Sequence, residues 1–171
     1  MVEVKLLEPV HAEELTRVYI KNREALRPFE PIREEQFYTV QGQRAIITST
    51  LHDDENYLFG IFKQDDGALI GRISLTGIIR GTFLSGYLGY WIDAGQRNKG
   101  YMTMAIMQVV AFSFIGLKLH RLEANVMPFN KPSLKVLEKC GFEKIGRASK
   151  YLCINGMWQD HDLHQLINEY M

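Results

Sequence analysis

The chain has 171 residues, of which 46% are hydrophobic and 23% are charged. This composition is typical of a folded globular protein and excludes an intrinsically disordered chain, and the length predicts a single domain over residues 1–171. The 20 Lys and Arg residues balance 20 Asp and Glu residues, so we expect no direct binding to nucleic acid.

The cysteines and the apolar segments indicate the cellular compartment. Cys140 and Cys153 are too few for a disulfide framework and indicate reduced thiols. Charged residues at positions 3, 5 and 8 exclude the apolar core of a signal peptide there. The longest apolar stretch, near 105–117, is too short to cross a bilayer. We therefore expect a cytoplasmic protein without a membrane partner.

Hydrophobic periodicity divides the first half of the chain into two kinds of element. Residues 2–6 alternate between apolar and polar, which favours a strand, whereas Pro28 and Pro31 indicate a loop between two helices. The turn residues Asp-Asp-Gly at 65–67 separate two further strands. The expected elements of this half are a strand at 2–6, helices at 9–26 and 34–51, and strands at 57–63 and 69–75.

The second half continues with mixed elements and closes on a hairpin. Gly141 is typical of a helix end, and Asn155-Gly156 is a strong two-residue hairpin signal. The expected elements are strands at 87–92, 121–126, 142–147, 151–154 and 157–166, with helices at 100–115 and 131–139. This order predicts one mixed α/β layer with parallel and antiparallel parts.

A basic turn between the strand at 87–92 and the next helix indicates an anion site. Free N–H groups and the helix dipole favour negative charge at a helix N-terminus, and a glycine lets a phosphate approach the backbone. The alternative is a solvated basic turn before a core helix. The residues expected to bind the anion are Arg97, Asn98, Lys99, Gly100, Tyr101, Met102 and Thr103.

This loop resembles the coenzyme A pyrophosphate loop of the GNAT acetyltransferases, in which Gln or Arg is followed by two residues, Gly, one residue, and Gly or Ala. Residues 97–102 fit this pattern, except that Met102 replaces the small last residue. A second block, from His120 through Asn130 and Ser133 to Gly141-Phe142, resembles the strand, loop, helix and Gly-Phe of the same family.

Further matches extend the resemblance to the RimJ/RimL branch of the family, and most closely to the RimJ type, which acetylates a ribosomal-protein alanine. They are the segments 22–24, 28–31, 79–83, 88–90 and 155–161. The resemblance implies a GNAT fold: a single mixed sheet of about seven strands flanked by helices, with splayed central parallel strands. It also implies acetyl-CoA as cosubstrate, with its pantetheine arm paired to the backbone of Trp91 and Ile92.

The same resemblance implies roles for three polar residues. Glu123 is the expected general base, because a related branch carries a glutamate beside the thioester; the alternative is a structural carboxylate paired with Arg121 or Lys118. Ser133 is expected to donate a hydrogen bond to the departing thiolate, and the alternative is a helix-capping role. Asn130 is expected to hydrogen-bond the pantetheine arm.

The expected substrate-binding residues are Phe29, Glu30, Arg80 and Tyr90, with Glu30 and Glu34 as the carboxylates expected to receive a cationic amine. The alternatives are a solvated loop for the first three and a core aromatic for Tyr90. No metal site is expected, because His161 and His164 face opposite sides of a strand.

The expected reaction is acetyl transfer to the N-terminal α-amine of a protein, with a ribosomal protein as the partner type. An α-amine has a pKa of about 7.7–8.0, so roughly a tenth is neutral at pH 7 and a strong general base is not needed. The alternatives are an acetyltransferase of a small amine and a non-catalytic acyl-CoA-binding module in ribosome assembly. The chain is expected to be a monomer or a homodimer.

Overall fold

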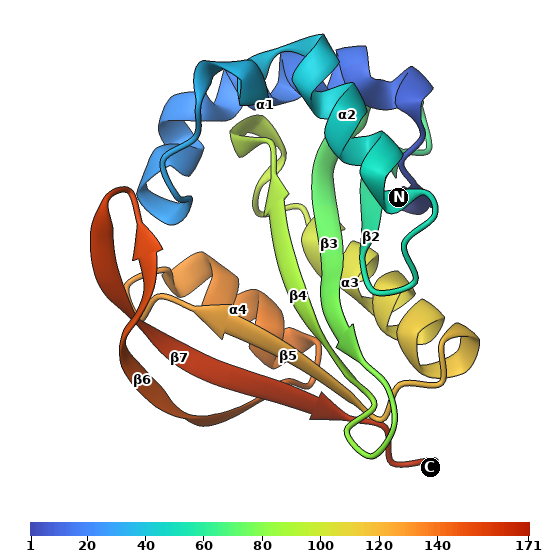
Figure 1. Ribbon diagram of the computed structural model, residues 1–171, viewed down its shortest axis with the longest axis vertical. Helices are drawn as coiled ribbons and strands as arrows, with labels where there is room; N and C mark the ends of the chain where they lie inside the picture. The colour runs from blue at the N-terminus through green and yellow to red at the C-terminus, as the bar shows by residue number, and fades with distance from the viewer.

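All seven strands join one mixed sheet in the computed structural model, which describes residues 1–171 (Figure 1). The strand order is β1-β2-β3-β4-β5-β7-β6. Only β4 and β5 pair in parallel, and every other neighbouring pair is antiparallel. The strands are β1 (Val2–Leu6), β2 (Tyr57–Lys63), β3 (Leu69–Ile79), β4 (Ser85–Ile92), β5 (Arg121–Val126), β6 (Glu143–Ile154) and β7 (Met157–Ile167).

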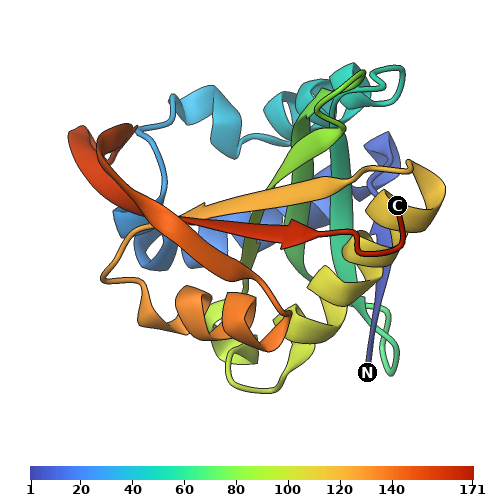
Figure 2. The same ribbon diagram turned by 90° about the horizontal axis from the view of Figure 1, so that it is seen from below.

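Two helices cover each face of this sheet (Figures 1 and 2). The helices are α1 (Ala12–Leu26) and α2 (Val40–Thr50) on one face, and α3 (Tyr101–Ala111) and α4 (Lys131–Lys139) on the other. Each face buries its own apolar core: 20 residues pack between the sheet and α3 and α4, and 11 pack between the sheet and α1 and α2. No helix is both long and apolar enough to cross a membrane. The predicted fold class is confirmed.

The central parallel strands separate after a short paired stretch. Their register runs from Ser85 opposite Arg121 to Tyr87 opposite Glu123 and then stops, although both strands continue. Figure 1 shows the resulting gap between the far ends of β4 and β5. Each strand keeps its other neighbour, β3 or β7, so the sheet remains continuous. The expected splay of the central strands is therefore present.

Several predicted boundaries are wrong for local reasons. The helix predicted from residue 34 begins at Val40, because the Thr39 hydroxyl caps it by accepting from the Gly42 N–H at 3.0 Å. The helix predicted to residue 115 ends at Ala111 and continues as a π-helical turn, Phe112–Gly116. The two strands predicted at 142–147 and 151–154 form one strand, β6, whose register shifts between Ala148 and Leu152. Strands β3 and β4 are also longer than predicted, reaching residue 79 and beginning at residue 85.

Candidate active site

The open edge of β4 faces the gap with specific peptide groups. The Asp93 N–H donates to the Ile70 carbonyl of β3 at 2.7 Å. Because successive peptide groups of a strand point to opposite edges, the peptide groups of Trp91 also point to β3, and those of Tyr90 and Ile92 point to the gap. The backbone of Trp91 therefore does not line the gap, which corrects the expectation for that residue. The Ile92 backbone is free to pair there, and its cofactor role stays a prediction.

Helix α1 holds the segment that follows β4. The buried Asp93 carboxylate accepts from Lys21 Nζ at 2.6 Å and from the Gly95 N–H at 3.3 Å. The Ala94 N–H donates to the side-chain oxygen of Asn22 at 2.8 Å. Burial opposes ionisation of Asp93, but these donors together hold its pKa below the ordinary value. This anchor fixes the start of the basic loop, and the sequence patterns did not single out Asp93.

The loop from Arg97 to Gly100 leads directly into the N-terminus of α3. Gly100 has a φ of 76°, and a Cβ at that position would meet no atom within 4 Å. It therefore supplies a left-handed backbone and an open surface. The first helical hydrogen bond runs from the Met104 N–H to the Gly100 carbonyl at 3.1 Å.

The three preceding N–H groups, of Tyr101, Met102 and Thr103, have no partner within the chain. These groups and the helix dipole form an anion-binding end. The Met102 side chain is buried in the core, so its size does not obstruct the loop.

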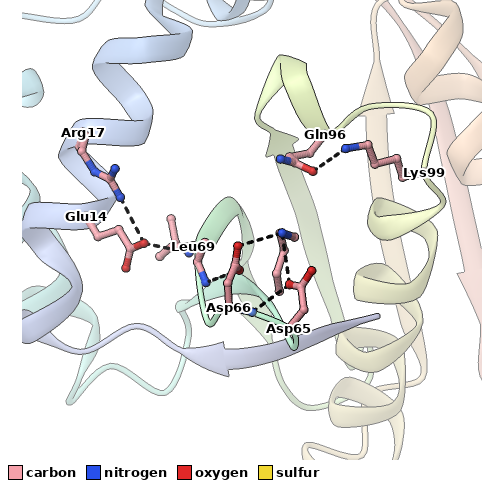
Figure 3. A network of polar contacts seen from close by, with 9 residues as sticks. Glu14, Arg17, Asp65, Asp66, Leu69, Gln96 and Lys99 are labelled. Atoms are coloured by element: carbon pink, nitrogen blue, oxygen red, sulfur yellow. Dashed lines mark hydrogen bonds and ion pairs between the residues drawn. The ribbon is translucent and has the colours of Figure 1, made fainter.

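The three residues before Gly100 surround this end with polar side chains. Arg97, Asn98 and Lys99 are all exposed. Lys99 Nζ donates to the Gln96 side chain at 2.9 Å, which turns the ammonium group back along the loop (Figure 3). Arg97 makes no side-chain hydrogen bond or ion pair, so its guanidinium is available to an anion. The predicted phosphate-binding residues are thus brought together around one helix end.

On the face of the sheet covered by α3 and α4, Ser133 and Tyr90 form a hydrogen-bonded pair. Tyr90 Oη lies 2.8 Å from Ser133 Oγ and 3.4 Å from the Ser133 carbonyl. Burial raises the pKa of Tyr90, so the phenol remains protonated at working pH. Asn130, rather than Ser133, caps α4, because its Oδ1 accepts from the Ser133 N–H at 3.4 Å. The Ser133 hydroxyl is therefore not used for capping.

This position of Tyr90 differs from the predicted one. Along β4, Leu88, Tyr90 and Ile92 pack with the core under α3 and α4, whereas Trp91 packs with the core under α1 and α2. The Tyr90 side chain therefore lies across the sheet from α1 and the loop that follows it. Its contact with Ser133 replaces the expected place in a substrate-binding wall.

Glu123 lies on the α1 side of the sheet, at the last paired position before the splay. Its carboxylate accepts from Arg121 Nε at 2.7 Å, and the same guanidinium also donates to Gln165 of β7. The pair is mostly buried, with 13% of the Glu123 side chain exposed. Burial and then the Glu123 charge raise the pKa of the neighbouring Tyr87. Glu123 is therefore paired with Arg121, as the alternative from the sequence proposed. The role of Glu123 as a general base stays a prediction.

The loop after α1 crosses the mouth of the splay. The ring of Phe29 lies 5.9 Å from that of Phe129, which follows β5. The Glu30 carbonyl accepts from the Asn155 N–H of the β6–β7 hairpin at 2.8 Å. Figure 2 shows this hairpin beside the loop. Phe29 and Glu30 thus lie together at the α1 side of the gap.

Arg80 does not join Phe29 and Glu30. It lies in the β3–β4 connection, before the first residue of β4, whereas the splay opens toward the last residues of that strand. Its guanidinium donates to the Leu117 carbonyl at 2.8 Å. This contact holds the hairpin against the end of the α3 segment, so the expected substrate-binding role of Arg80 is not supported by its position.

Asn125 is a polar residue of the gap that the sequence patterns did not single out. It follows Glu123 by two residues on β5 and so lies on the same face, beyond the last β4–β5 pair. Its side-chain oxygen is buried and has no hydrogen-bond partner within the chain.

The two histidines of β7 each contact a backbone carbonyl close by in the sequence. Nδ1 of His161 lies 3.0 Å from the Gln159 carbonyl, and Nδ1 of His164 lies 3.1 Å from the Asp162 carbonyl.

Comparisons with known proteins agree with this geometry. The acetyltransferase (GNAT) domain family matches residues 4–143. "Probable N-acetyltransferase YjcK" of Bacillus subtilis (strain 168) is 46% identical over 168 residues, which cover 96% of this chain and 93% of the relative. The ribosomal protein uS5-alanine N-acetyltransferase of Escherichia coli (strain K12) is 36% identical over 166 residues, covering 95% and 86%.

A solved structure extends the likeness to the whole fold. Mycobacterium smegmatis RimJ in complex with CoA-disulfide matches with a TM-score of 0.92 and 26% identity, covering 99% of this chain and 83% of that one. The open edge of β4, the free N–H groups at α3 and the unobstructed side of Gly100 fit a pyrophosphate with an extended arm. When bound, acetyl-CoA supplies the acetyl group as a thioester. The chain belongs to the GNAT family and is an acetyl-CoA-dependent N-acetyltransferase.

Proposed function

We propose that the protein acetylates the N-terminal α-amine of a protein, and that a ribosomal protein is its acceptor. The observation that carries this proposal is the two-sided gap between β4 and β5. Ser133 and Tyr90 border it on the α3 and α4 face, and the Phe29–Glu30 loop crosses its mouth on the other face. The 36% identical relative named for acting on the alanine of uS5 supports the choice of acceptor.

Each wall of the gap has a separate task in this proposal. The free N–H groups of Tyr101, Met102 and Thr103 hold the pyrophosphate. The Ser133 hydroxyl, which is hydrogen-bonded to the Tyr90 hydroxyl, donates a hydrogen bond to the departing sulfur. The departing thiolate resembles that of cysteine, whose pKa is about 8.5, and so needs a hydrogen-bond donor rather than a strong acid. The amine enters from the α1 side, past Phe29.

The acceptor class follows from the amine's own acidity. An α-amine has a pKa of about 7.7–8.0 and a lysine about 10.4, so the neutral, attacking form is more than a hundredfold scarcer for lysine at pH 7. An unprotonated α-amine can therefore react in a site without a strong base. Glu123 is tied to Arg121, which fits a site of this kind.

The test uses matched peptides incubated with acetyl-CoA. One set has free N-terminal Ala or Ser, and the other set is N-blocked and carries one lysine. Release of free coenzyme A and peptide mass are measured together. The proposal predicts a mass gain of one acetyl group only in the first set. Turnover only with a small amine, or binding of acetyl-CoA without turnover on any amine, would contradict it.

A further inference from the structure

The Glu30 carboxylate differs from the other acidic groups near the gap in having no partner. Glu123 is paired with Arg121, and Asp93 is paired with Lys21. Glu30 makes no side-chain hydrogen bond and no ion pair, although it is only partly exposed. A half-buried carboxylate without a partner carries an uncompensated desolvation cost. Such a cost is typical of groups that act on a bound molecule.

The neighbours of Glu30 place it across the mouth of the splay. Its own loop contacts the β5 side through Phe29, and its backbone is fixed by Asn155. On the β4 side its charge acts on Tyr19, whose hydroxyl accepts from Trp91 Nε1 at 2.9 Å. Trp91 is near the open end of β4, so these neighbours place Glu30 beside the mouth of the gap.

The charged groups that face Glu30 are few and do not neutralise it. Arg33 from the same loop and Arg72 from β3 act on it by charge alone, without a hydrogen bond, and Tyr19 faces it from α1. The Arg33 guanidinium instead stacks over the Phe37 ring at 4.7 Å. Burial outweighs both arginines and raises the pKa of Glu30. The carboxylate is thus a better proton acceptor than an ordinary surface glutamate.

We propose that Glu30 is the general base of the reaction, taking a proton from the ammonium form of the acceptor. This proposal rests on the proposed function. One proton passes from the ammonium nitrogen to a carboxylate oxygen, which leaves a neutral amine and a neutral carboxylic acid. The acid returns this proton to solvent before the next turnover. The step favours an N-terminal amine over a lysine, because an α-ammonium group with a pKa of about 7.7–8.0 gives up its proton far more readily than a lysine ammonium group with a pKa of about 10.4.

The test compares Glu30→Gln with Glu24→Gln, an exposed glutamate near the end of helix α1, as a matched control. The rate constant kcat/KM is measured from pH 6 to 9 with a free N-terminal Ala peptide, and acetyl-CoA affinity is measured by calorimetry. At pH 7 we expect Glu30→Gln to lose about 10-fold in kcat/KM, because only about a tenth of the peptide α-amine is neutral there without a base. The loss should shrink toward pH 9, where the peptide amine is already neutral. Glu24→Gln should match the wild type, and acetyl-CoA affinity should be unchanged in both variants.

Two outcomes would overturn the proposal. A loss that is equal at every pH would show that Glu30 only binds or orients the acceptor, and no loss at all would show that it does neither. Failure of the proposed function is separate, because the wild-type enzyme would then acetylate no free N-terminus at any pH.

Discussion

Removal of the Ser133 hydroxyl tests how the gap stabilises the leaving group. In Ser133→Ala, the departing sulfur loses its hydrogen-bond donor, while the Asn130 cap is kept because it uses the backbone N–H of residue 133. Loss of one donor to a developing oxyanion costs about 100-fold to 1,000-fold in kcat. A thiolate is a weaker base than such an oxyanion, so we expect a smaller loss of about 10-fold to 100-fold, or about 1.4–2.7 kcal/mol. The affinity for acetyl-CoA should not change.

Tyr90→Phe measures the second hydroxyl of the same pair. The hydrogen bond of 2.8 Å between Tyr90 and Ser133 is of ordinary strength, with a net value of about 0.5–1.5 kcal/mol. If Tyr90 acts only by orienting Ser133, the variant should lose about 2-fold to 12-fold in kcat. The double variant should then be no slower than Ser133→Ala alone, because the two side chains act in series.

Stopped-flow detection of free thiol gives kcat for all three variants, and calorimetry gives the Kd for acetyl-CoA. Additive losses in the double variant would refute the orienting role of Tyr90. An equal loss of kcat and of acetyl-CoA affinity in Ser133→Ala would show that Ser133 binds the cosubstrate rather than assisting the departure of sulfur.

Three further predictions concern the loop, the ion pair and stability. Gly100→Ala should raise the Kd for acetyl-CoA about 10-fold and cost about 1–2 kcal/mol of stability. The control Gly67→Ala, with a similar φ of 71° and an equally open surface, should cost stability alone. Calorimetry measures the Kd, and thermal melting measures the loss of stability. Glu123→Gln should leave the pH profile of kcat/KM unchanged, because its carboxylate is paired with Arg121. If the variant lost the acidic limb of that profile, Glu123 would be the general base instead. Asp162→Asn should cost about 1–2 kcal/mol of stability at pH 7, because hydrogen bonds from Arg147, and then from Lys144, lower the pKa of buried Asp162 to about 2. The cost stays in this range because the Arg147 side chain is half exposed, so solvent screens its charge. That stability is present above the unfolded pKa of about 3.9 and is lost as pH falls toward 2, so denaturation curves of the two proteins should converge there, and a constant difference would contradict the pairing.

The sheet and its splay were predictable because they follow from periodicity and from a family resemblance carried by long motifs. Strand β1 and helix α4, for example, have the predicted bounds. The start of α2 was missed because a 3₁₀ turn occupies 35–38 and Thr39 is the true cap. The continuity of β6 was missed because a bulge between Ala148 and Leu152, where Lys150 has a φ of 47°, interrupts the regular alternation that marks a strand.

The parts of the site that depend on backbone conformation were predictable from the sequence. The parts that depend on the direction of a side chain were less so. Gly100 and the start of α3 follow from the local pattern of a strand, a basic turn and a helix. The direction of Tyr90 depends on the register of β4, which short-range patterns do not specify. Arg80 was wrongly assigned to the substrate site because the order of motifs does not show at which end β4 and β5 separate. The Lys21–Asp93 contact spans 72 residues and is visible only in the folded chain.

The most direct test of the central claim uses one peptide that offers both amines, a free N-terminal Ala and an internal lysine. The peptide is incubated with acetyl-CoA at pH 7, and tandem mass spectrometry locates the added acetyl group. The account predicts a single acetyl group on the N-terminal nitrogen and an unmodified lysine. Acetylation of the lysine, or of both amines at similar rates, would contradict it.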